Sequence, residues 1–411
     1  MQNESTVLGG VLMTYTLATR MKAFQSSIFS ELGAYKKEKI AAGHNMIDLS
    51  IGNPDMPPAD FVRETMVHTA SEKESYGYTL SGIQEFHEAV TEYYNNTHNV
   101  LLNADKEVLL LMGSQDGLVH LPMVYANPGD IILVPDPGYT AYETGIQMAG
   151  AISYYMPLKK ENDFLPDLEV IPEEIADQAK MMILNFPGNP VPAMAHEDFF
   201  KEVIAFAKKH NIIVVHDFAY AEFYFDGNKP ISFLSVPGAK EVGVEINSLS
   251  KSYSLAGSRI GYMIGNEEIV RALTQFKSNT DYGVFLPIQK AACAALRNGA
   301  TFCEKNREIY QERRDTLIDG FRTFGWNVDK PAGSMFVWAE IPQGWTSLDF
   351  AYALMDRANV VVTPGHAFGP HGEGFVRIAL VQDKEVLQQV VENIRNSGIF
   401  VLEKVNELVK N

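Results

Sequence analysis

Short apolar runs alternate with helical patterns between about residues 106 and 265. The runs are Val108–Met112, Ile131–Val134, Ile152–Met156, Met181–Leu184, Ile212–Val215, Val244–Ile246 and Arg259–Ile264. Continuous apolar strands that alternate with helices are typical of a mostly parallel sheet covered on both faces. We therefore predict an α/β domain, in which ligands bind beyond the carboxyl ends of the strands.

The pattern changes near residue 285 and indicates a second domain. The expected elements are a long helical stretch at Phe285–Arg314 leading out of the sheet, a hairpin at Trp326–Ile341 with its turn at Pro331–Gly333, a helix near Ser347–Ala358, a strand at Phe375–Leu380 and a helix from Lys384. A chain of 411 residues is too long for one simple core. We predict a large domain at residues 56–290, a smaller α+β domain at 291–411, and an N-terminal arm at 1–55 that joins the smaller domain.

Composition excludes several classes of partner. A net charge of −17 argues against binding to nucleic acid or anionic membranes, and no apolar run approaches the ~18 residues of a membrane helix. The start of the chain has no basic region typical of a signal peptide. Cys293 and Cys303 suit buried thiols in a reducing cytosol, and the histidines show no metal-ligand spacing. The sequence thus predicts a cytoplasmic protein without a metal.

One lysine has unusual surroundings. Lys251 follows an apolar run, lies among small hydroxyl residues in Ser248–Gly261, and precedes Arg259 by eight positions. Such a context suits a partly buried amine flanked by anion-binding groups. The segment resembles the lysine signature of class I/II aminotransferases of fold type I, and the resemblance extends from Gly52 to Arg377. It implies a mostly parallel, seven-stranded sheet domain of that fold, and pyridoxal 5′-phosphate bound to Lys251 as a Schiff base.

Two residues after the run Ile212–Val215 match positions of this family. A buried carboxylate keeps the coenzyme's pyridine nitrogen protonated, and the resemblance gives this role to Asp217. It implies that Tyr220 hydrogen-bonds the coenzyme's 3′-oxygen. The alternative is a helix N-cap aspartate followed by a core tyrosine.

The segment Asn185–Pro190 has the composition of a turn. It also resembles the family's asparagine–proline motif, which implies that Asn189 contacts the 3′-oxygen and the substrate carboxylate. Val191 and Pro192 stand where Thr and Gly are commoner, which leaves the loop shape open. The matching peptide bond of that family is cis, so the resemblance implies a cis Asn189–Pro190 bond here.

A glycine turn at Gly113–Gly117 opens a helical pattern, and such a turn exposes backbone N–H groups to an anion. The resemblance assigns a phosphate-binding set consisting of Ser114, Gln115, Ser248, Ser250 and Arg259. It also implies that Tyr139 stacks on the pyridine ring, whereas Tyr139 by itself would be an aromatic residue of a turn.

Substrate contacts are expected from both ends of the chain. Arg377 lies inside an apolar strand and therefore needs an anionic partner. By resemblance this partner is the substrate α-carboxylate, and the alternative is an internal ion pair. Gly52 resembles the family glycine that lines this carboxylate, although Leu49–Asp55 could equally be a plain turn.

The segment Ser75–Gly82 resembles the family segment whose tyrosine reaches the coenzyme phosphate of a neighbouring subunit. Tyr78 matches best, but its spacing is one residue short, and Tyr76 remains an alternative. The resemblance implies a homodimer with shared active sites. A tyrosine pair packed within one subunit is the other interpretation.

The implied activity is ping-pong transfer of an amino group between an amino acid and a 2-oxo acid, with Lys251 as covalent anchor and acid–base. Alternatives are a β-lyase of the same fold acting on sulfur amino acids and, more distantly, a non-catalytic regulator. No second arginine is placed for a dicarboxylate, which favours neutral donors. The candidates for the side-chain pocket are Tyr15, Phe24, Ile28, Tyr282 and Phe285.

Overall fold

The computed structural model describes residues 6–8, 11–13, 15–24 and 28–400. Its larger part is built on a seven-stranded sheet with the order β4-β10-β9-β8-β7-β5-β6. The strands are β4 (Val108–Leu111), β5 (Ile131–Asp136), β6 (Ile152–Pro157), β7 (Ala179–Asn185), β8 (Ile213–Asp217), β9 (Gly243–Ser248) and β10 (Gly261–Gly265). β5, β6, β7, β8 and β9 pair in parallel, and β10 runs antiparallel to β4 and β9. The predicted mostly parallel α/β sheet is confirmed.

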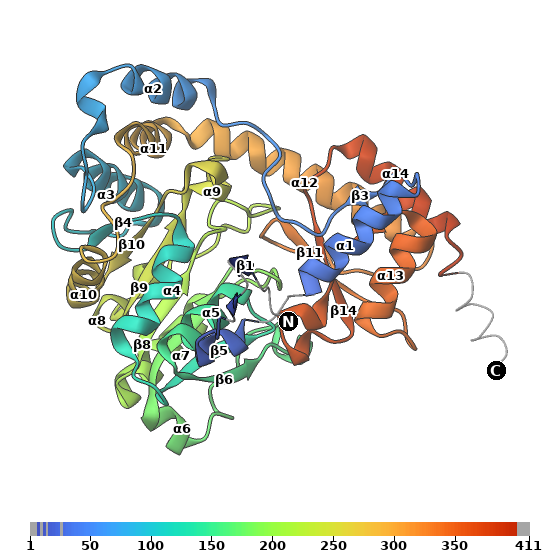
Figure 1. The fold of residues 1–411 in the computed structure, drawn as a ribbon, viewed down its shortest axis with the longest axis horizontal. Coiled ribbons are helices and arrows are strands. Elements are labelled where there is room, and N and C mark those ends of the chain that lie inside the picture. Colours follow the sequence, from blue (N-terminus) through green and yellow to red (C-terminus); the bar gives the residue numbers. More distant parts are fainter. Residues whose placement is uncertain (1–5, 9–10, 14, 25–27, 401–411) are drawn as a thin grey trace.

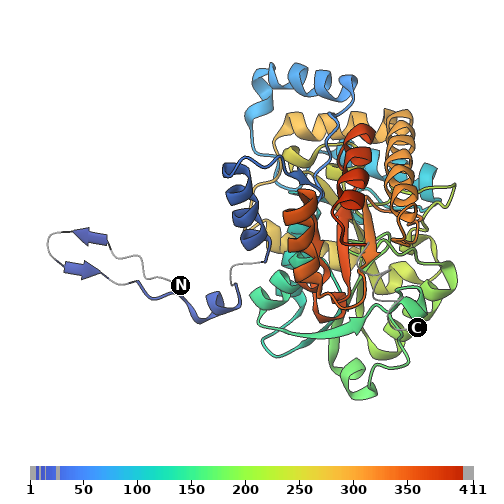
Figure 2. The same ribbon diagram turned by 90° about the vertical axis from the view of Figure 1, so that its right-hand side faces the viewer.

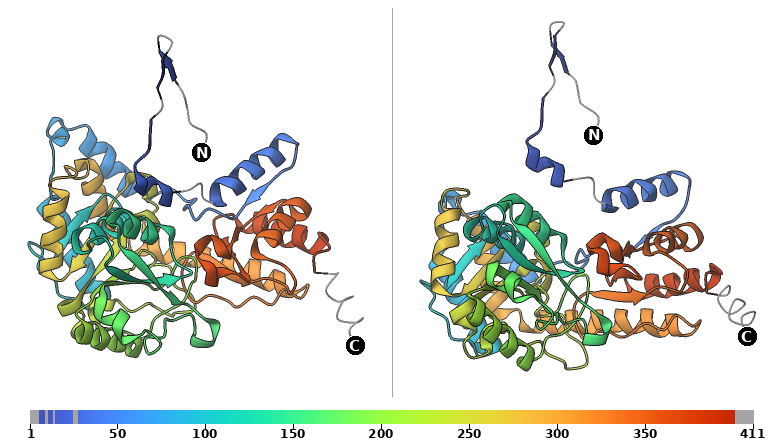
Figure 3. Two further views of the ribbon diagram at one scale, coloured as in Figure 1. Left: turned by 60° about the horizontal axis from the view of Figure 1, so that its bottom comes forward. Right: turned by 90° about the horizontal axis from the view of Figure 1, so that it is seen from below.

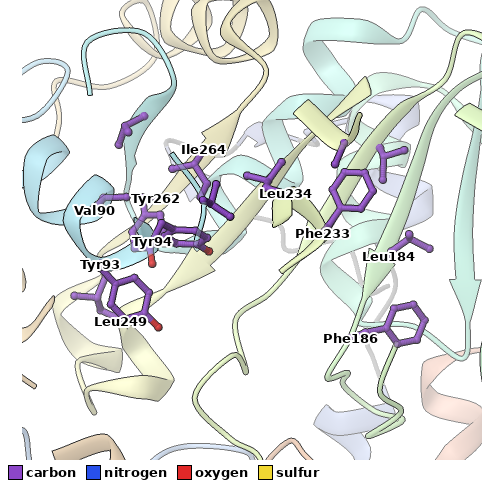
Figure 4. Close-up of a cluster of buried hydrophobic side chains, with 14 of the residues drawn as sticks. Val90, Tyr93, Tyr94, Leu184, Phe186, Phe233, Leu234, Leu249, Tyr262 and Ile264 are labelled. Atoms are coloured by element: carbon purple, nitrogen blue, oxygen red, sulfur yellow. The ribbon is translucent and has the colours of Figure 1, made fainter. Parts of the chain in front are cut away.

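Helices cover both faces of this sheet. They are α2 (Asp60–Ala70), α3 (Gln84–His98), α4 (Ser114–Tyr125), α5 (Thr140–Ala149), α6 (Glu173–Gln178), α7 (Glu197–His210), α8 (Ala239–Val242), α9 (Leu249–Ser252), α10 (Glu267–Lys277) and α11 (Leu286–Asn298). Alternate strand residues enter two different cores, since Leu110 and Leu184 pack with α3, α7 and α11, whereas Leu109 and Ile183 pack with α4, α5 and α10. Figure 4 shows part of the first core.

The smaller part combines an early segment with the C-terminal third of the chain. Its elements are α1 (Ile28–Ala41), β3 (Ile47–Asp48), α12 (Ala300–Arg322), β11 (Phe336–Glu340), α13 (Ser347–Ala358), β12 (Val360–Val361), β13 (Thr363–Pro364), β14 (Phe375–Ala379) and α14 (Lys384–Asn396). β11, β14 and β13 form an antiparallel sheet, and β3 pairs with β12. Leu32 of α1 packs against Met355 of α13 and Val361 of β12. Figure 3 shows α1, in blue, beside the C-terminal helices, in orange and red.

Figure 1 shows α12 running from the sheet domain to the smaller part, which is the bridge expected there. The helical stretch expected at Phe285–Arg314 consists of two helices, α11 and α12, which are separated at Gly299. A Cβ atom on Gly299 would lie 2.4 Å from the Ala295 oxygen and 2.5 Å from the Tyr253 ring. The two helices therefore meet at a close approach that only glycine fits. The domain bounds at residues 55 and 290 stay a prediction.

The predicted hairpin at Trp326–Ile341 is wrong. Only Phe336–Glu340 forms a strand, and its partner is β14. Trp326 instead stacks on Phe321 at 4.4 Å between ring centroids, and its Nε1 donates to the Glu340 oxygen at 2.7 Å. The Ala332 oxygen accepts from the Phe225 N–H at 2.8 Å, so the expected turn pairs with a loop of the sheet domain.

A short hairpin, β1 (Thr6–Leu8) and β2 (Val11–Met13), precedes the short 3-10 helix η1 (Thr19–Ala23). Figure 2 shows this hairpin projecting from the rest of the molecule. No helix in the part of the chain that the structure describes is long and apolar enough to cross a membrane.

Candidate active site

A cavity of about 580 Å³ opens at the carboxyl ends of the parallel strands, between the sheet and the smaller part. The predicted site residues in its lining are Gly52, Ser114, Gln115, Tyr139, Asn189, Asp217, Tyr220, Ser248, Ser250, Lys251, Arg259 and Arg377. Of the predicted set, Tyr78 alone does not line this cavity. Residues spread over more than 300 positions therefore converge on one site.

Lys251 lies in α9, the short helix that follows β9. The Ser248 hydroxyl caps this helix by accepting from the Ser250 N–H at 3.1 Å. The Lys251 Nζ donates to the Gly52 oxygen at 2.6 Å. Burial, together with the positive charges of Arg377 and Arg259, lowers the pKa of Lys251 to about 8. The amine is therefore readily available as a nucleophile or base near neutral pH.

Asp217 ends β8 and is buried. One carboxylate oxygen accepts from the Tyr142 hydroxyl at 2.8 Å, and the other accepts from the Ala219 N–H at 3.1 Å. Burial raises the pKa of Asp217, because no cation pairs with this carboxylate among the described residues. No helix begins here, so the N-cap interpretation is wrong. Tyr220 is also buried, which raises its pKa.

A tight turn after β7 presents Asn189 to the cavity. The Asn185 side chain donates to the Asp217 backbone oxygen at 2.8 Å and accepts from the Asn189 N–H at 2.8 Å. The Asn189–Pro190 peptide bond is cis, as predicted. Asn185 thus ties this turn to the strand that carries Asp217.

Cationic and hydroxyl groups gather where α4 begins. A Cβ atom on Gly113 (φ +82°) would lie 2.5 Å from the Arg259 guanidinium, so glycine is required for this approach. The guanidinium donates to the Ala256 oxygen at 3.0 Å and forms no ion pair with a described carboxylate. The Ser250 hydroxyl is buried without a partner. A helix N-terminus, an arginine and free hydroxyls together suit a phosphate group.

Arg377 lies between the rings of Phe336 and Phe368, at 4.4 and 4.6 Å from their centroids. It donates to the Asn189 side-chain oxygen at 2.7 Å and to the Ser50 oxygen at 2.5 Å. Burial lowers its pKa to about 10, so the guanidinium stays charged at neutral pH. Within the described ranges no carboxylate pairs with Arg377, which excludes the internal ion pair. Its Nε is buried without a partner. An anionic ligand is therefore the group that this site lacks.

Of the tyrosines Tyr76, Tyr78 and Tyr139, only Tyr139 lines the cavity. Tyr139 lines the cavity, and its hydroxyl donates to Gln115 at 3.3 Å. Tyr78 is 83% exposed, with its ring 5.2 Å from that of Tyr282. Tyr76 donates to the Ala70 oxygen at 2.8 Å and packs against Phe285. Neither Tyr76 nor Tyr78 lines the cavity within one chain.

Of the residues predicted to form a pocket for the substrate side chain, only Phe24 lines a cavity at or beside the site. Phe24 lines a second cavity of about 330 Å³, which shares Tyr139, Thr140 and Phe368 with the first. Phe29 lines the first cavity, whereas its neighbour Ile28 packs beside Leu32. The other candidates, Tyr15, Tyr282 and Phe285, are exposed and line neither cavity.

Several lining residues were missed from the sequence. Asn185 ends β7, so the rule that ligands lie beyond strand ends could have found it. Phe336 and Phe368 come from distant segments and carry no local signal. The described residues contain no group of three or more His, Cys, Asp or Glu side chains arranged to hold a metal ion.

The family model for aminotransferases of class I and II matches residues 44–394. The chain belongs to this family. The aminotransferase is 42% identical to the LL-diaminopimelate aminotransferase of Moorella thermoacetica over 379 residues, covering 92% of this chain and 97% of the relative. The protein of the same name from Syntrophobacter fumaroxidans is 42% identical over 384 residues, covering 93% and 99%.

Solved structures agree with this assignment. Substrate-bound BacF from Bacillus subtilis has a TM-score of 0.89 at 39% identity and covers 93% of this chain and 97% of its own. An aminotransferase from Staphylococcus aureus has a TM-score of 0.87 at 32% identity, covering 94% and 100%. The aminotransferase has the fold type I architecture and depends on pyridoxal 5′-phosphate. The alternatives of a β-lyase and a non-catalytic regulator are not supported.

Proposed function

We propose that Lys251 is the covalent anchor of the coenzyme and the acid–base group of amino transfer. The observation that carries this proposal is a buried amine with a pKa of about 8 in one cavity with Asp217 and Arg377. Bound pyridoxal phosphate withdraws electrons from the substrate Cα and so makes its proton removable. The Lys251 amine then takes the proton from Cα.

The remaining lining residues divide between coenzyme and substrate. Asp217 would face the pyridine nitrogen, because its buried carboxylate forms no ion pair with a described cation. Tyr220 and Asn189 would contact the 3′-oxygen, and Tyr139 would lie on the ring. The phosphate-binding set is the one predicted, namely Ser114, Gln115, Ser248, Ser250 and Arg259.

Arg377 would hold the substrate α-carboxylate. Its guanidinium is charged, buried and without an anionic partner among the described residues, and Asn189 already accepts from one of its nitrogens. Gly52 would lie beside this carboxylate, because its oxygen accepts from Lys251 in the same part of the cavity. The amino group of the substrate is thereby held near Lys251.

We further propose LL-diaminopimelate as the amino donor, as the names of relatives about 40% identical suggest. The described lining contains three cations, Lys251, Arg259 and Arg377, and each has a proposed partner. A side-chain carboxylate alone would therefore find no further cation among the described residues that line this cavity. The distal end of diaminopimelate carries an ammonium and a carboxylate, so its net charge is zero.

A donor panel tests this substrate. The purified enzyme is assayed with 2-oxoglutarate and LL-diaminopimelate, its meso isomer, aspartate, phenylalanine or alanine. We expect kcat/KM to be at least ~10-fold higher for LL-diaminopimelate, because an unmatched buried polar or charged group costs more than ~1.4 kcal/mol. A higher kcat/KM for another donor would contradict LL-diaminopimelate as the amino donor. It would not contradict the proposed amino-transfer chemistry.

A homodimer with shared sites is proposed from an apolar patch on this chain. The patch comprises Tyr76, Tyr78, Leu80, Tyr282 and Phe285, all exposed. Two ring pairs, Tyr78–Tyr282 and Tyr76–Phe285, connect the segment around residues 76–80 with the segment around residues 282–285. A second copy would cover this patch and would bring Tyr78 to the neighbouring phosphate site. The cytoplasmic location and the absence of nucleic-acid and membrane partners stay predictions.

A further inference from the structure

A fully buried pair of ionisable residues lies directly behind Asp217. His216 of β8 pairs in register with Glu245 of β9, and neither side chain is exposed to solvent. The His216 Nδ1 lies 2.9 Å from a Glu245 carboxylate oxygen. Because side chains alternate along a strand, His216 points to the face opposite that of Asp217.

Apolar rings pack against the His216 side of this pair. The His216 ring lies 5.2 Å from the Phe200 ring and 5.0 Å from the Phe218 ring, centroid to centroid. The Phe233 ring lies 6.3 Å from the His216 ring, and Figure 4 shows Phe233 among the buried hydrophobic side chains of this core. A charge in such a place is costly unless it is paired and hydrogen-bonded.

The hydrogen bonds determine where the protons lie. The His216 Nε2 faces the Phe186 backbone oxygen at 3.0 Å, and a carbonyl oxygen only accepts, so Nε2 carries a hydrogen. Glu245 accepts from the Phe233 N–H at 2.8 Å and from the Ser232 hydroxyl at 3.0 Å.

A third donor to Glu245 is the Tyr94 hydroxyl, at 2.7 Å. The Tyr94 oxygen itself accepts from the Asn247 amide at 3.3 Å, so its hydrogen points to Glu245. Three neutral donors stabilise the ionised carboxylate. The one remaining proton between the pair therefore belongs on the His216 Nδ1.

We propose that His216 is an imidazolium ion that positions the Asn189 turn and keeps Asp217 ionised. This inference rests on the proposed role of Asp217. Its first action goes through the Phe186 oxygen, at the start of the turn that carries Asn189. Its second action is electrostatic, because a positive charge one residue away opposes the effect of burial on Asp217.

Other titratable groups facing His216 do not replace this charge. His98 of α3 lies nearby, with its ring 5.4 Å from that of Phe218. Burial lowers the pKa of His98 to about 4, so His98 is neutral under working conditions. Glu245 and Asp217 are the carboxylates beside His216. The single positive charge of the imidazolium pairs directly with Glu245 and acts on Asp217 only through space.

The protonation state is tested by nitrogen NMR of the full-length enzyme with ¹⁵N-labelled histidine at pH 8.5. We expect one histidine to keep hydrogens on both ring nitrogens, and its signals to vanish in His216→Gln. A neutral ring at His216 would overturn the proposal. Because His216→Gln could fail to fold, neutron diffraction of the unsubstituted enzyme provides a second measurement, and one hydrogen rather than two on the His216 ring would overturn the proposal equally.

The positioning role is tested with coenzyme labelled with ¹⁵N at its ring nitrogen. We expect this nitrogen to be protonated at pH 8 in the native enzyme and to lose its proton in His216→Gln and Glu245→Gln. His210→Gln is the matched control, since His210 is also buried and bonded to an aspartate, Asp177. If the coenzyme ring nitrogen is equally protonated in the native enzyme and in both variants, the proposed role of His216 is wrong, but the role of Asp217 is not contradicted. An unprotonated ring in the native enzyme would instead contradict the role of Asp217.

Discussion

The Lys251 Nζ lies 2.6 Å from the backbone oxygen of Gly52. This hydrogen bond joins α9 of the sheet domain to the segment that leads from β3, which pairs with β12 of the smaller part. The amine is thus held at the boundary between the two parts of the molecule. The same boundary contributes Arg377, so the Lys251 amine and the Arg377 guanidinium line one cavity where the two parts meet.

Substitution of Lys251 by alanine should abolish turnover and the visible absorbance of the lysine-bound coenzyme. We propose this amine as the covalent anchor and the base, and no other described lysine lines the cavity. Circular dichroism should be unchanged. Lys180→Ala, at an exposed position of β7, is the control and should keep both properties. Turnover by Lys251→Ala near the native rate would refute the assignment.

Replacing Asp217 by alanine should reduce kcat by ~10²-fold or more, because one preorganised charge interaction contributes roughly 3 kcal/mol. The coenzyme should still bind through its phosphate. Steady-state rates and coenzyme titration separate these two effects. If the variant turned over at the native rate, Asp217 would have only a structural role through Tyr142 and Ala219.

The pKa of about 8 at Lys251 predicts a specific pH dependence. The rate at which the coenzyme-free enzyme combines with pyridoxal phosphate should rise through about pH 8 as the amine loses its proton. Arg377 and Arg259 both lower this pKa, so Arg377→Gln should move the midpoint to higher pH. Stopped-flow absorbance gives both midpoints, and an unchanged midpoint in Arg377→Gln would contradict the electrostatic explanation.

The same shift affects the stability of the coenzyme-free enzyme. Between about pH 8 and the ordinary lysine range near 10.4, the unfolded chain binds a proton that folded Lys251 lacks. The free energy of unfolding should therefore rise with pH across this window, relative to Lys251→Met, by about 1–3 kcal/mol. Urea unfolding at several pH values measures the difference. If the difference in the free energy of unfolding between the native enzyme and Lys251→Met falls as the pH rises, folding raises the pKa of Lys251 instead of lowering it.

Substituting Arg377 by lysine should raise the KM for the amino donor by ~10–10²-fold. Lysine keeps the charge but loses the paired donors that match a carboxylate, at a cost of about 1.5–3 kcal/mol. Arg395→Lys, on the exposed part of α14, serves as the control. An unchanged KM in Arg377→Lys would place the carboxylate elsewhere.

Local sequence patterns were enough to predict the sheet, and the resemblance to class I/II aminotransferases selected residues that the structure brings into one cavity. Each apolar run marks a strand, and all of these strands except β6 are largely buried. Ser114, Tyr139 and Asp217 stand at or just after strand ends. The Asn189 turn follows the same rule. These residues are informative because a parallel sheet collects strand ends at one edge.

Tertiary contacts explain what the sequence patterns did not predict. The residues at 326–334 have the alternation of a hairpin, but Trp326 finds a stacking partner in Phe321 and Ala332 pairs with Phe225. Phe336 and Phe368 sandwich Arg377 from segments with no signal of their own. The periodicity of apolar residues indicates which face of an element is buried, but it does not identify the residues that pack against this face.

A shared active site should be detectable by mixing inactive subunits. If Tyr78 reaches the phosphate site of the neighbouring subunit, Tyr78→Ala loses a hydrogen bond to a charged group, about 1.5–3 kcal/mol, and its activity falls. Lys251→Ala is inactive for a different reason. In a mixed dimer of these two variants, the Tyr78→Ala subunit supplies Lys251, and the Lys251→Ala subunit supplies Tyr78. One of the two sites is then intact.

Refolding the two variants together should therefore restore activity to about a quarter of the native value, since half of the dimers are mixed and each has one working site. The control mixes Lys251→Ala with Asp217→Ala, two residues that line one cavity in the same chain, and it should restore nothing. Tyr76→Ala in place of Tyr78→Ala distinguishes the two tyrosines. If confirmed mixed dimers show no gain with either tyrosine variant, each subunit completes its own site, and the ring pairs Tyr78–Tyr282 and Tyr76–Phe285 are packing within one chain.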